Sequence, residues 1–237
     1  MNMFNMESAL KRGRSFEGIK SLRSHRVYDK LALLVLLTAV VGGISYRAVD
    51  VNVSVGRLIA PSFVVAMAAM LIGQFKPNYA KVAAPIYALA EGVVLGVISK
   101  SYANVRGGIV PTAIVATSLL FVGCLLVFRT GVVKVTPKFV QMTSIAGLTL
   151  FALYLLSIFG LSVPGINELG PKGMIFGVIG LGIGLSYLFI DFDRIEKAEQ
   201  SQTLHDTAEW FLAFQLLLSL VMVYINVLRI LGSSRRN

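Results

Sequence analysis

The carboxylates are the strongest candidates for functional residues in this chain, because several of them lie within or beside long apolar stretches. Asp191 follows the glycine-rich apolar segment 173–190 and begins the acidic run Asp-Phe-Asp-Arg-Ile-Glu-Lys-Ala-Glu at 191–199. An ionisable side chain at the end of a membrane helix is costly and marks a candidate functional site. We expect the sixth apolar helix to break at Asp191, which places this carboxylate at the membrane boundary.

The segment between the last two apolar stretches concentrates negative charge. It holds six of the twelve acidic residues of the chain, namely Asp191, Asp193, Glu196, Glu199, Asp206 and Glu209. Clustered carboxylates attract cations and share protons. Their spacing does not match an EF-hand loop, so no dedicated calcium cage is expected. The alternative is a solvated loop whose charge Arg194 and Lys197 partly balance.

Glu91 lies in the middle of a third apolar stretch, within Ala-Leu-Ala-Glu-Gly-Val-Val-Leu-Gly. A charged carboxylate near the bilayer centre costs roughly 2.5–3.5 kcal/mol on insertion scales. Glu91 is therefore expected to be neutral at pH 7, and either to hydrogen-bond a neighbouring helix or to line a path for ions or protons. Both alternatives stay open at this point.

The last apolar stretch carries a polar stripe at helical spacing, formed by Gln215, Ser219, Asn226 and Arg229. A helix that faced lipid would not have this stripe. The stripe indicates either a central helix hydrogen-bonded to its neighbours or a helix that lines a polar path.

Signatures of enzymes and of bound metals or cofactors do not occur in the sequence. The two histidines, His25 and His205, lie outside the apolar stretches, and Cys124 is the single cysteine. No metal site and no cofactor are therefore expected. The motifs of serine hydrolases, zinc proteases and nucleotide-binding loops are missing, so we predict that the protein is not an enzyme.

The elements that must position these residues are membrane helices. Of the 237 residues, 56% are hydrophobic and only 14% are charged, which is typical of an all-α polytopic membrane protein. Seven spans are predicted, at 31–46, 57–75, 82–100, 109–128, 138–161, 171–190 and 207–231. They form one membrane domain, 30–232, between a basic cytoplasmic tail, 1–29, and a short C-terminal tail, 233–237.

Loop charge predicts the orientation. Placing the N-terminus in the cytoplasm puts 14 of the 22 basic residues inside and 8 outside. The basic tail is expected to lie against anionic lipid headgroups. The net charge is +10, but the basic residues do not form a stripe with interleaved aromatic residues. Nucleic acid is therefore not an expected partner.

Glycines predict which helix faces pack closely. Gly173, Gly177, Gly180 and Gly184 recur at helical spacing in the sixth span, as Gly92 and Gly96 do in the third. Such spacings allow close helix contact. Gly177 and Gly184 share a face with Asp191, so the face that packs inward carries this carboxylate.

Three segments of the last two spans resemble the C-terminal signature of the Bax inhibitor-1-like family, also called the transmembrane Bax inhibitor motif family, which includes bacterial YccA- and YetJ-type proteins. They are Tyr-Leu-Phe-Ile-Asp-Phe-Asp-Arg-Ile-Glu at 187–196, Glu-Trp-Phe-Leu-Ala-Phe at 209–214 and Tyr-Ile-Asn-Val-Leu-Arg-Ile-Leu-Gly at 224–232. The resemblance covers about 30–232 and is specific in these two spans.

The resemblance implies a bundle in which six helices wrap the seventh, with a pH-sensitive calcium leak gated by an aspartate pair. Asp191 matches the first aspartate, whereas Ser219 stands at the position of the second. A serine cannot supply a second titrating carboxylate, so the pH response is expected to be weaker or displaced. Glu91 and Asp193 are the other carboxylates considered for that role.

The expected function is therefore a pH-influenced calcium or cation leak in the bacterial inner membrane. Asp191 and Ser219 form the expected gate, and the candidate ion-path residues are Glu91, Asp193, Gln215 and Asn226. The expected partners are membrane lipid, transiently bound cations and other membrane proteins. The alternative is a non-conducting regulator of membrane-protein quality control or stress signalling.

Overall fold

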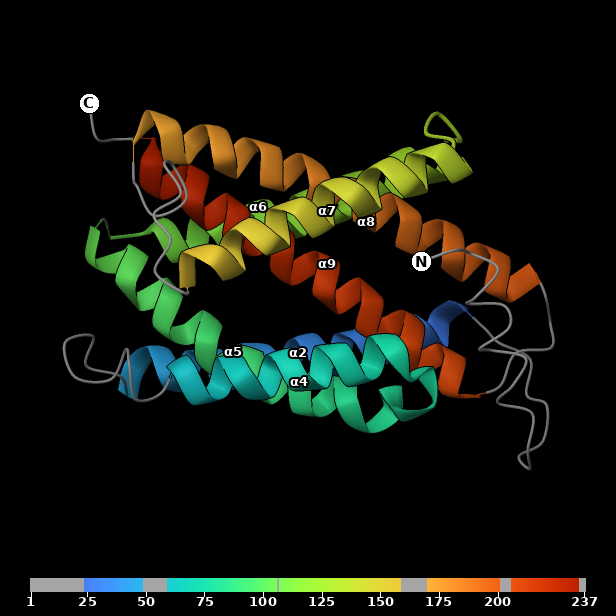
Figure 1. The fold of residues 1–237 in the computed structure, drawn as a ribbon, viewed down its shortest axis with the longest axis horizontal. Coiled ribbons are helices and arrows are strands. Elements are labelled where there is room, and N and C mark those ends of the chain that lie inside the picture. Colours follow the sequence, from blue (N-terminus) through green and yellow to red (C-terminus); the bar gives the residue numbers. More distant parts are fainter. Residues whose placement is uncertain (1–23, 49–58, 106, 159–169, 201–205, 235–237) are drawn as a thin grey trace. The chain divides into compact units, whose positions relative to one another are not determined.

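The computed structural model describes residues 24–48, 59–105, 107–158, 170–200 and 206–234, and the part of the chain that it describes is all-helical (Figure 1). Seven α-helices and one short 3-10 turn make up these ranges. They are α2 (Ser24–Ala48), α4 (Ala60–Phe75), η2 (Pro77–Tyr79), α5 (Ala80–Val105), α6 (Ile109–Arg129), α7 (Pro137–Ile158), α8 (Pro171–Gln200) and α9 (Asp206–Ser233).

Prolines and glycines set several helix boundaries. α7 and α8 each begin at a proline, whose fixed φ suits the first helical position. Pro77 separates α4 from α5 and starts the η2 turn. Gly108 precedes α6 with a φ of 82°, a left-handed conformation that favours glycine. Apolar composition then maintains each helix, because a backbone in lipid must satisfy its own hydrogen bonds.

Six of the described helices are long and apolar enough to cross a membrane. The remaining one, α4, has 16 residues and so measures about 24 Å, against about 30 Å for the hydrocarbon core of a bilayer. The all-α fold class is confirmed. The length of α4 alone does not show that this helix crosses the membrane.

The described helices divide into two compact units that share α9. Unit 1 contains α2, α4, η2, α5 up to Ser101, the end of α8 from Arg194, and α9 up to Leu217. Unit 2 contains α6, α7, α8 up to Asp193, and α9 from Leu218. Of the six long helices, α9 has the largest buried share, 72% of its apolar window, whereas α7 has 11%. α5 follows closely with 67%, so α9 and α5 are the two most buried of these six helices.

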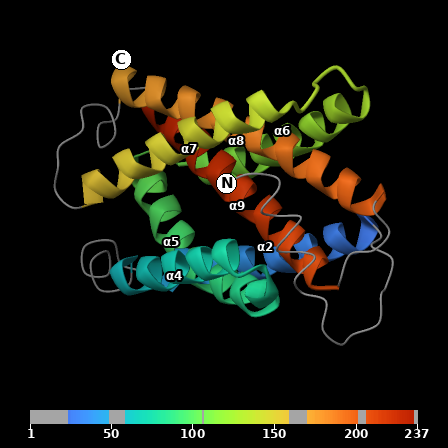
Figure 2. The ribbon, with the colours of Figure 1, turned by 45° about the vertical axis from the view of Figure 1, so that its right-hand side comes forward.

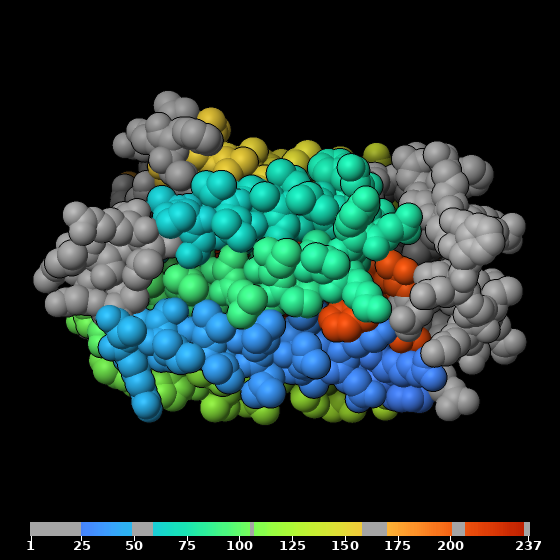
Figure 3. All heavy atoms as spheres, turned by 90° about the horizontal axis from the view of Figure 1, so that it is seen from below, coloured from blue at the N-terminus to red at the C-terminus, as the bar shows by residue number. Residues whose placement is uncertain are grey.

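In unit 1, α2 and α5 run in the same direction in close contact. A Cβ atom on Gly92 would lie 2.9 Å from the carbonyl oxygen of Thr38, and one on Gly96 would lie 2.5 Å from that of Gly42. Residue numbers rise together along the two helices, so the helices are parallel. Figures 1 and 2 show α2, α4 and α5 side by side, and Figure 3 shows α5 between the other two.

The parallel contact explains the role of α4. A chain that leaves the end of α2 and enters α5 in the same direction must first return to the side where α2 began. α4 is the helix that the structure describes in this stretch. If α2 and α5 cross the membrane, α4 must cross it as well, which agrees with seven crossings.

In unit 2, α8 and the second half of α9 run antiparallel along the glycine face. A Cβ atom on Gly177 would meet Ile230, and one on Gly184 would meet Val223. As the residue number rises on α8, it falls on α9. The close packing predicted from the glycine spacing of this helix is therefore present.

The two largest differences from the predicted helix boundaries are the end of α8, at 200 rather than 190, and the start of α2, at 24 rather than 31. The sixth helix does not break at Asp191 but continues to Gln200, so the acids Asp191 to Glu199 are helical rather than in a loop. Buried Leu188, Phe192, Ile195 and Ala198 continue the apolar periodicity through this acidic run, which maintains the helix.

The first helix begins at Ser24, within the segment expected to be a basic tail. Val27, Leu31 and Leu34 are buried at helical spacing, which explains the earlier start. The rest of the expected tail, 1–23, and the last three residues, 235–237, lie outside the described residues.

Candidate functional site

The carboxylate of Asp191 and the hydroxyl of Ser219 meet between α8 and α9 in unit 2. The Oγ atom of Ser219 donates a hydrogen bond to Oδ2 of Asp191 over 2.5 Å. Asp191 is only 2% exposed and Ser219 only 6%. The two residues expected to form the gate are therefore in contact, through a buried hydrogen bond between a carboxylate and a neutral hydroxyl.

The glycine face of α8 permits this contact. Asp191 continues the face that Gly177 and Gly184 form against α9, because these residues are spaced by seven. Gly180 lies against the side-chain amide of Asn226, and an added Cβ atom would collide with it. The close approach of the two helices thus depends on small residues, and the polar side chains lie within the same seam.

Asn226 contributes to packing rather than to a contact between side chains. Its Nδ2 atom donates to the carbonyl oxygen of Met222, one turn earlier on α9. Its Oδ1 atom is buried without a hydrogen-bond partner. Buried polar atoms are usually paired, so this oxygen is an acceptor available within the α8–α9 seam.

Arg229 and Tyr154 hold the far part of α9 to α7. Nη1 of Arg229 donates to the phenol oxygen of Tyr154 over 2.8 Å, and the guanidinium carbon lies 4.9 Å from the centroid of its ring. Arg229 was expected to belong to the polar stripe, and it contacts a second helix as the other members of the stripe do.

In unit 1, Gln215 forms a reciprocal amide pair with Gln74 of α4. Each Nε2 atom donates to the Oε1 atom of the other residue, over 3.3 Å and 2.8 Å. The neighbouring Phe214 ring packs edge-to-face on Tyr87 of α5 with centroids 5.4 Å apart. These contacts show Gln215 joining α9 to α4, which is the interhelical role considered from the sequence.

Glu91 lies buried on α5, also in unit 1. Its carboxyl group is hydrogen-bonded to the hydroxyl of Tyr87, one turn earlier on the same helix. This partner lies on the same helix, whereas the alternatives expected from the sequence were a hydrogen bond to a neighbouring helix or a path for ions or protons. Glu91 and Tyr87 therefore form a buried polar pair on α5, and the ring of Tyr87 also contacts Phe214.

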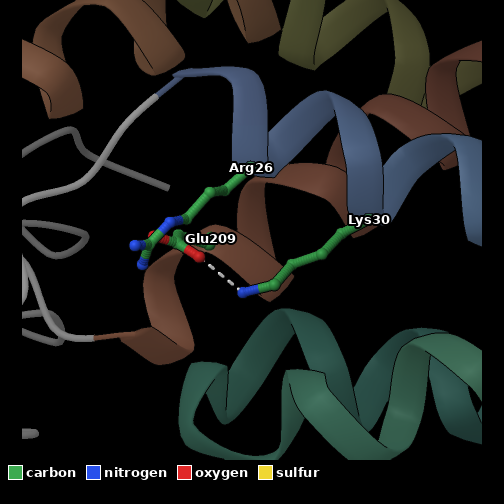
Figure 4. A network of polar contacts seen from close by, with 3 residues as sticks. All are labelled: Arg26, Lys30 and Glu209. Atoms are coloured by element: carbon green, nitrogen blue, oxygen red, sulfur yellow. Dashed lines mark hydrogen bonds and ion pairs between the residues drawn. The ribbon is translucent and has the colours of Figure 1, made fainter.

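Sequence reasoning missed a buried ion pair at the start of α9. From the sequence, Glu209 was counted among the clustered acids between the last two spans and given no partner, whereas its side chain is buried at the start of α9 and only 1% of the residue is exposed. Its Oε2 atom lies 2.6 Å from Nζ of Lys30, and its Oε1 atom lies 3.7 Å from Nη1 of Arg26 (Figure 4). A usable signal was present, since Arg26 and Lys30 are four residues apart and share one helix face.

The candidate residues from the sequence thus fall into two sets. Asp191, Asp193, Ser219 and Asn226 belong to unit 2, and Glu91 and Gln215 belong to unit 1. Within unit 2, Asp191 and Ser219 are in contact. Asp193 is partly exposed, and it follows Asp191 by two residues, so it lies on a different face of α8.

The buried oxygens define what this arrangement can do chemically. Carboxylate and hydroxyl oxygens are ligands that hard cations such as calcium accept. Among the residues that the structure describes, no group of three histidine, cysteine, aspartate or glutamate side chains is placed to hold a metal.

Comparison with known families agrees with this architecture. A family model described as Bax inhibitor 1 like matches residues 3–236, nearly the whole chain. No individual match was found among curated proteins. The match includes every helix and both residues of the Asp191–Ser219 contact. This chain, with its apolar spanning helices, is an integral membrane protein that belongs to the Bax inhibitor 1 like family.

Proposed function

We propose that this protein is a calcium leak whose closed state is held by the contact between Asp191 and Ser219. The buried hydrogen bond between α8 and α9 is the observation that carries the proposal. It joins a carboxylate of α8 to α9, which has the largest buried share of the six long helices that the structure describes, at the position where the family resemblance implies a gate. Separation of the two groups would expose oxygen ligands suited to calcium.

The serine gives the gate a different titration from that of an aspartate pair. Two carboxylates in contact share a proton, so their interaction depends strongly on pH. Ser219 stays neutral, and a single carboxylate responds to protons less steeply. The pH response of the leak should therefore be weak or displaced. Glu91, Asp193, Gln215 and Asn226 are the further residues proposed to line the path of the ion.

The leak is tested by calcium flux into proteoliposomes that contain the full-length protein. Asp191→Asn keeps an acceptor for Ser219 but removes the charge, and neutral hydrogen bonds are weaker than charge-assisted ones. A loss of roughly 1 kcal/mol from the closing contact would raise the open fraction about fivefold. The matched control is Glu196→Gln, which removes one negative charge from an exposed position of the same helix and should leave the flux within about twofold of the parent.

A second candidate function is a non-conducting regulator that binds other membrane proteins in quality control or stress signalling. The observation that favours it is the hydrogen bonding of Gln215, Ser219 and Arg229 to other helices, which occupies three of the four residues of the polar stripe with internal contacts. A parent protein that passes no calcium at any pH, together with inactive Asp191→Asn, would favour this regulator over the leak.

The proposed location is the bacterial inner membrane with the N-terminus in the cytoplasm. The excess of basic residues in the loops on that side supports it. Cysteines introduced at Lys76 and Lys134 should resist a membrane-impermeant thiol reagent added to intact cells, and one at Arg106 should react. The reverse labelling pattern would overturn the orientation.

A further inference from the structure

The start of α9 is fastened to α2 by charge. Glu209 lies between Lys30, at 2.6 Å, and Arg26, at 3.7 Å (Figure 4). The side chain of Glu209 is 2% exposed, that of Lys30 is 17% exposed, and that of Arg26 is 38% exposed. The ammonium nitrogen of Lys30 also lies 5.2 Å from the ring centroid of Trp210, the next residue of α9. Lys30 therefore holds two consecutive residues of α9.

The burial of the Lys30–Glu209 pair determines how much it contributes to stability and what its separation costs. A buried ion pair adds little net stability, because desolvation of both charges offsets their attraction. Loss of one partner, however, leaves a buried or part-buried charge without its nearest counter-charge. The two favourable arrangements are a closed pair and an open pair with both groups hydrated, and a partly separated pair is unfavourable. Two arrangements of such a contact are therefore expected, one closed and one open.

The segment beside the ion pair makes polar and aromatic contacts that can also be separated. Gln215 pairs with Gln74, and Phe214 packs on Tyr87 and against Gly73. The first turns of α9 are thus joined to α2, α4 and α5. α9 continues without a break from Glu209 to Ser219, ten residues or about 15 Å further along.

We propose that the Lys30–Glu209 ion pair is a latch that regulates the leak. Closed, it holds the start of α9 on α2. Open, it frees this segment of the helix that carries Ser219, and calcium passes more readily. The latch rests on the proposed function, because the leak is the activity that it regulates. Arg26 contributes less, since it is further from Glu209 and more exposed.

The experiment compares five full-length proteins in the same liposomes: the parent, Glu209→Gln, Lys30→Gln, the double charge reversal Lys30→Glu with Glu209→Lys, and the control Arg26→Gln. Two quantities are measured for each protein. Amide hydrogen exchange of residues 207–214 reports the opening of the start of α9, and calcium flux reports the leak. The double reversal guards against a variant that has simply lost its fold.

Both single variants should raise exchange in this segment about tenfold or more, because each removes the nearest counter-charge of the remaining partner and so favours opening. Their calcium flux should rise with it, the double reversal should return both quantities toward the parent, and Arg26→Gln should change neither by more than about twofold. Unchanged exchange in the single variants, or a double reversal no better than they are, would overturn the latch.

The exchange measurement separates the two proposals. A parent that conducts calcium, with variants that open the segment but leave the flux unchanged, would contradict regulation by the latch and leave the leak standing. A parent that conducts no calcium would contradict the proposed function, whereas the exchange rates would still show whether the ion pair holds α9.

Discussion

The two halves of α9 are held by different chemistry. In the first half, Glu209 is paired with the cations Lys30 and Arg26, and Gln215 is paired with Gln74. In the second half, Ser219 gives Asp191 a neutral donor within a seam lined by glycines. A charged pair is costly to break, whereas a carboxylate held by a hydroxyl can change its charge while the helices stay in contact.

The comparison predicts that the largest loss of stability comes from the charged pair. Lys30→Met removes the closer cation and leaves Glu209 buried beside the more distant Arg26. We expect a loss of about 3 kcal/mol in the free energy of unfolding. Titration with SDS in mixed micelles measures this quantity. The exposed partner provides the control, since Arg26→Gln should cost less than about 1 kcal/mol. Equal losses for the two variants would show that burial does not separate their contributions.

The glycine seam of the second half predicts the next largest effect. An added methyl group at Gly180 would overlap the amide of Asn226. Gly180→Ala should therefore cost about 2 kcal/mol by overpacking. Gly182 lies on the same helix with no atom within 4 Å of an added Cβ, so Gly182→Ala is the matched control. The same SDS titration applies, and a stable Gly180→Ala protein would mean that the seam can widen without cost.

The hydroxyl at the gate should contribute less to stability than either of these features. Ser219→Ala removes the donor to Asp191 but leaves the helix packing intact. The expected loss is about 1 kcal/mol, since hydrogen bonds between membrane helices are modest. The loss of stability in Ser219→Ala, divided by the loss in Lys30→Met, measures the difference between the two halves of α9 directly. A loss as large as that of Lys30→Met would remove the distinction.

The smallest effect is predicted at Glu91, whose carboxyl group is bonded to Tyr87. If Glu91 is neutral, as its place within an apolar stretch predicts, Glu91→Gln preserves both its charge and an acceptor for the tyrosine. The free energy of unfolding should change by less than about 0.5 kcal/mol. Strong destabilisation by this isosteric change would show that an ionised carboxylate is needed there.

Much of the helical architecture could be predicted from the local periodicity of the sequence. The seven apolar stretches correspond to the seven described helices, and the spacing of Gly177, Gly184 and Asp191 identified the face of α8 that packs on α9. These features could be predicted because each depends on residues of one helix. The acidic run after Asp191 was misread as a loop, since charge was given more weight than the buried positions Phe192 and Ile195.

Contacts between distant parts of the chain were harder to predict. Lys30 and Glu209 are 179 residues apart, and no local pattern shows which acid meets which base. Gln74 and Gln215 were each visible as polar residues, but their pairing depends on the return of α4 beside α9. The pairing of Asp191 with Ser219 could be predicted, because the family resemblance assigns both positions to the gate. Periodicity alone would not have paired them.

The central claim is that Asp191 and its serine partner form the gate of a calcium leak. The most direct measurement is calcium flux in proteoliposomes against pH for the parent, Ser219→Asp and Ser219→Asn. Ser219→Asp places a second carboxylate against Asp191, and the pair must share a proton. Its flux should depend more steeply on pH than that of the parent, whereas the non-titrating Ser219→Asn should not show this change. Three superimposable curves would contradict the gate and leave the non-conducting regulator as the better account.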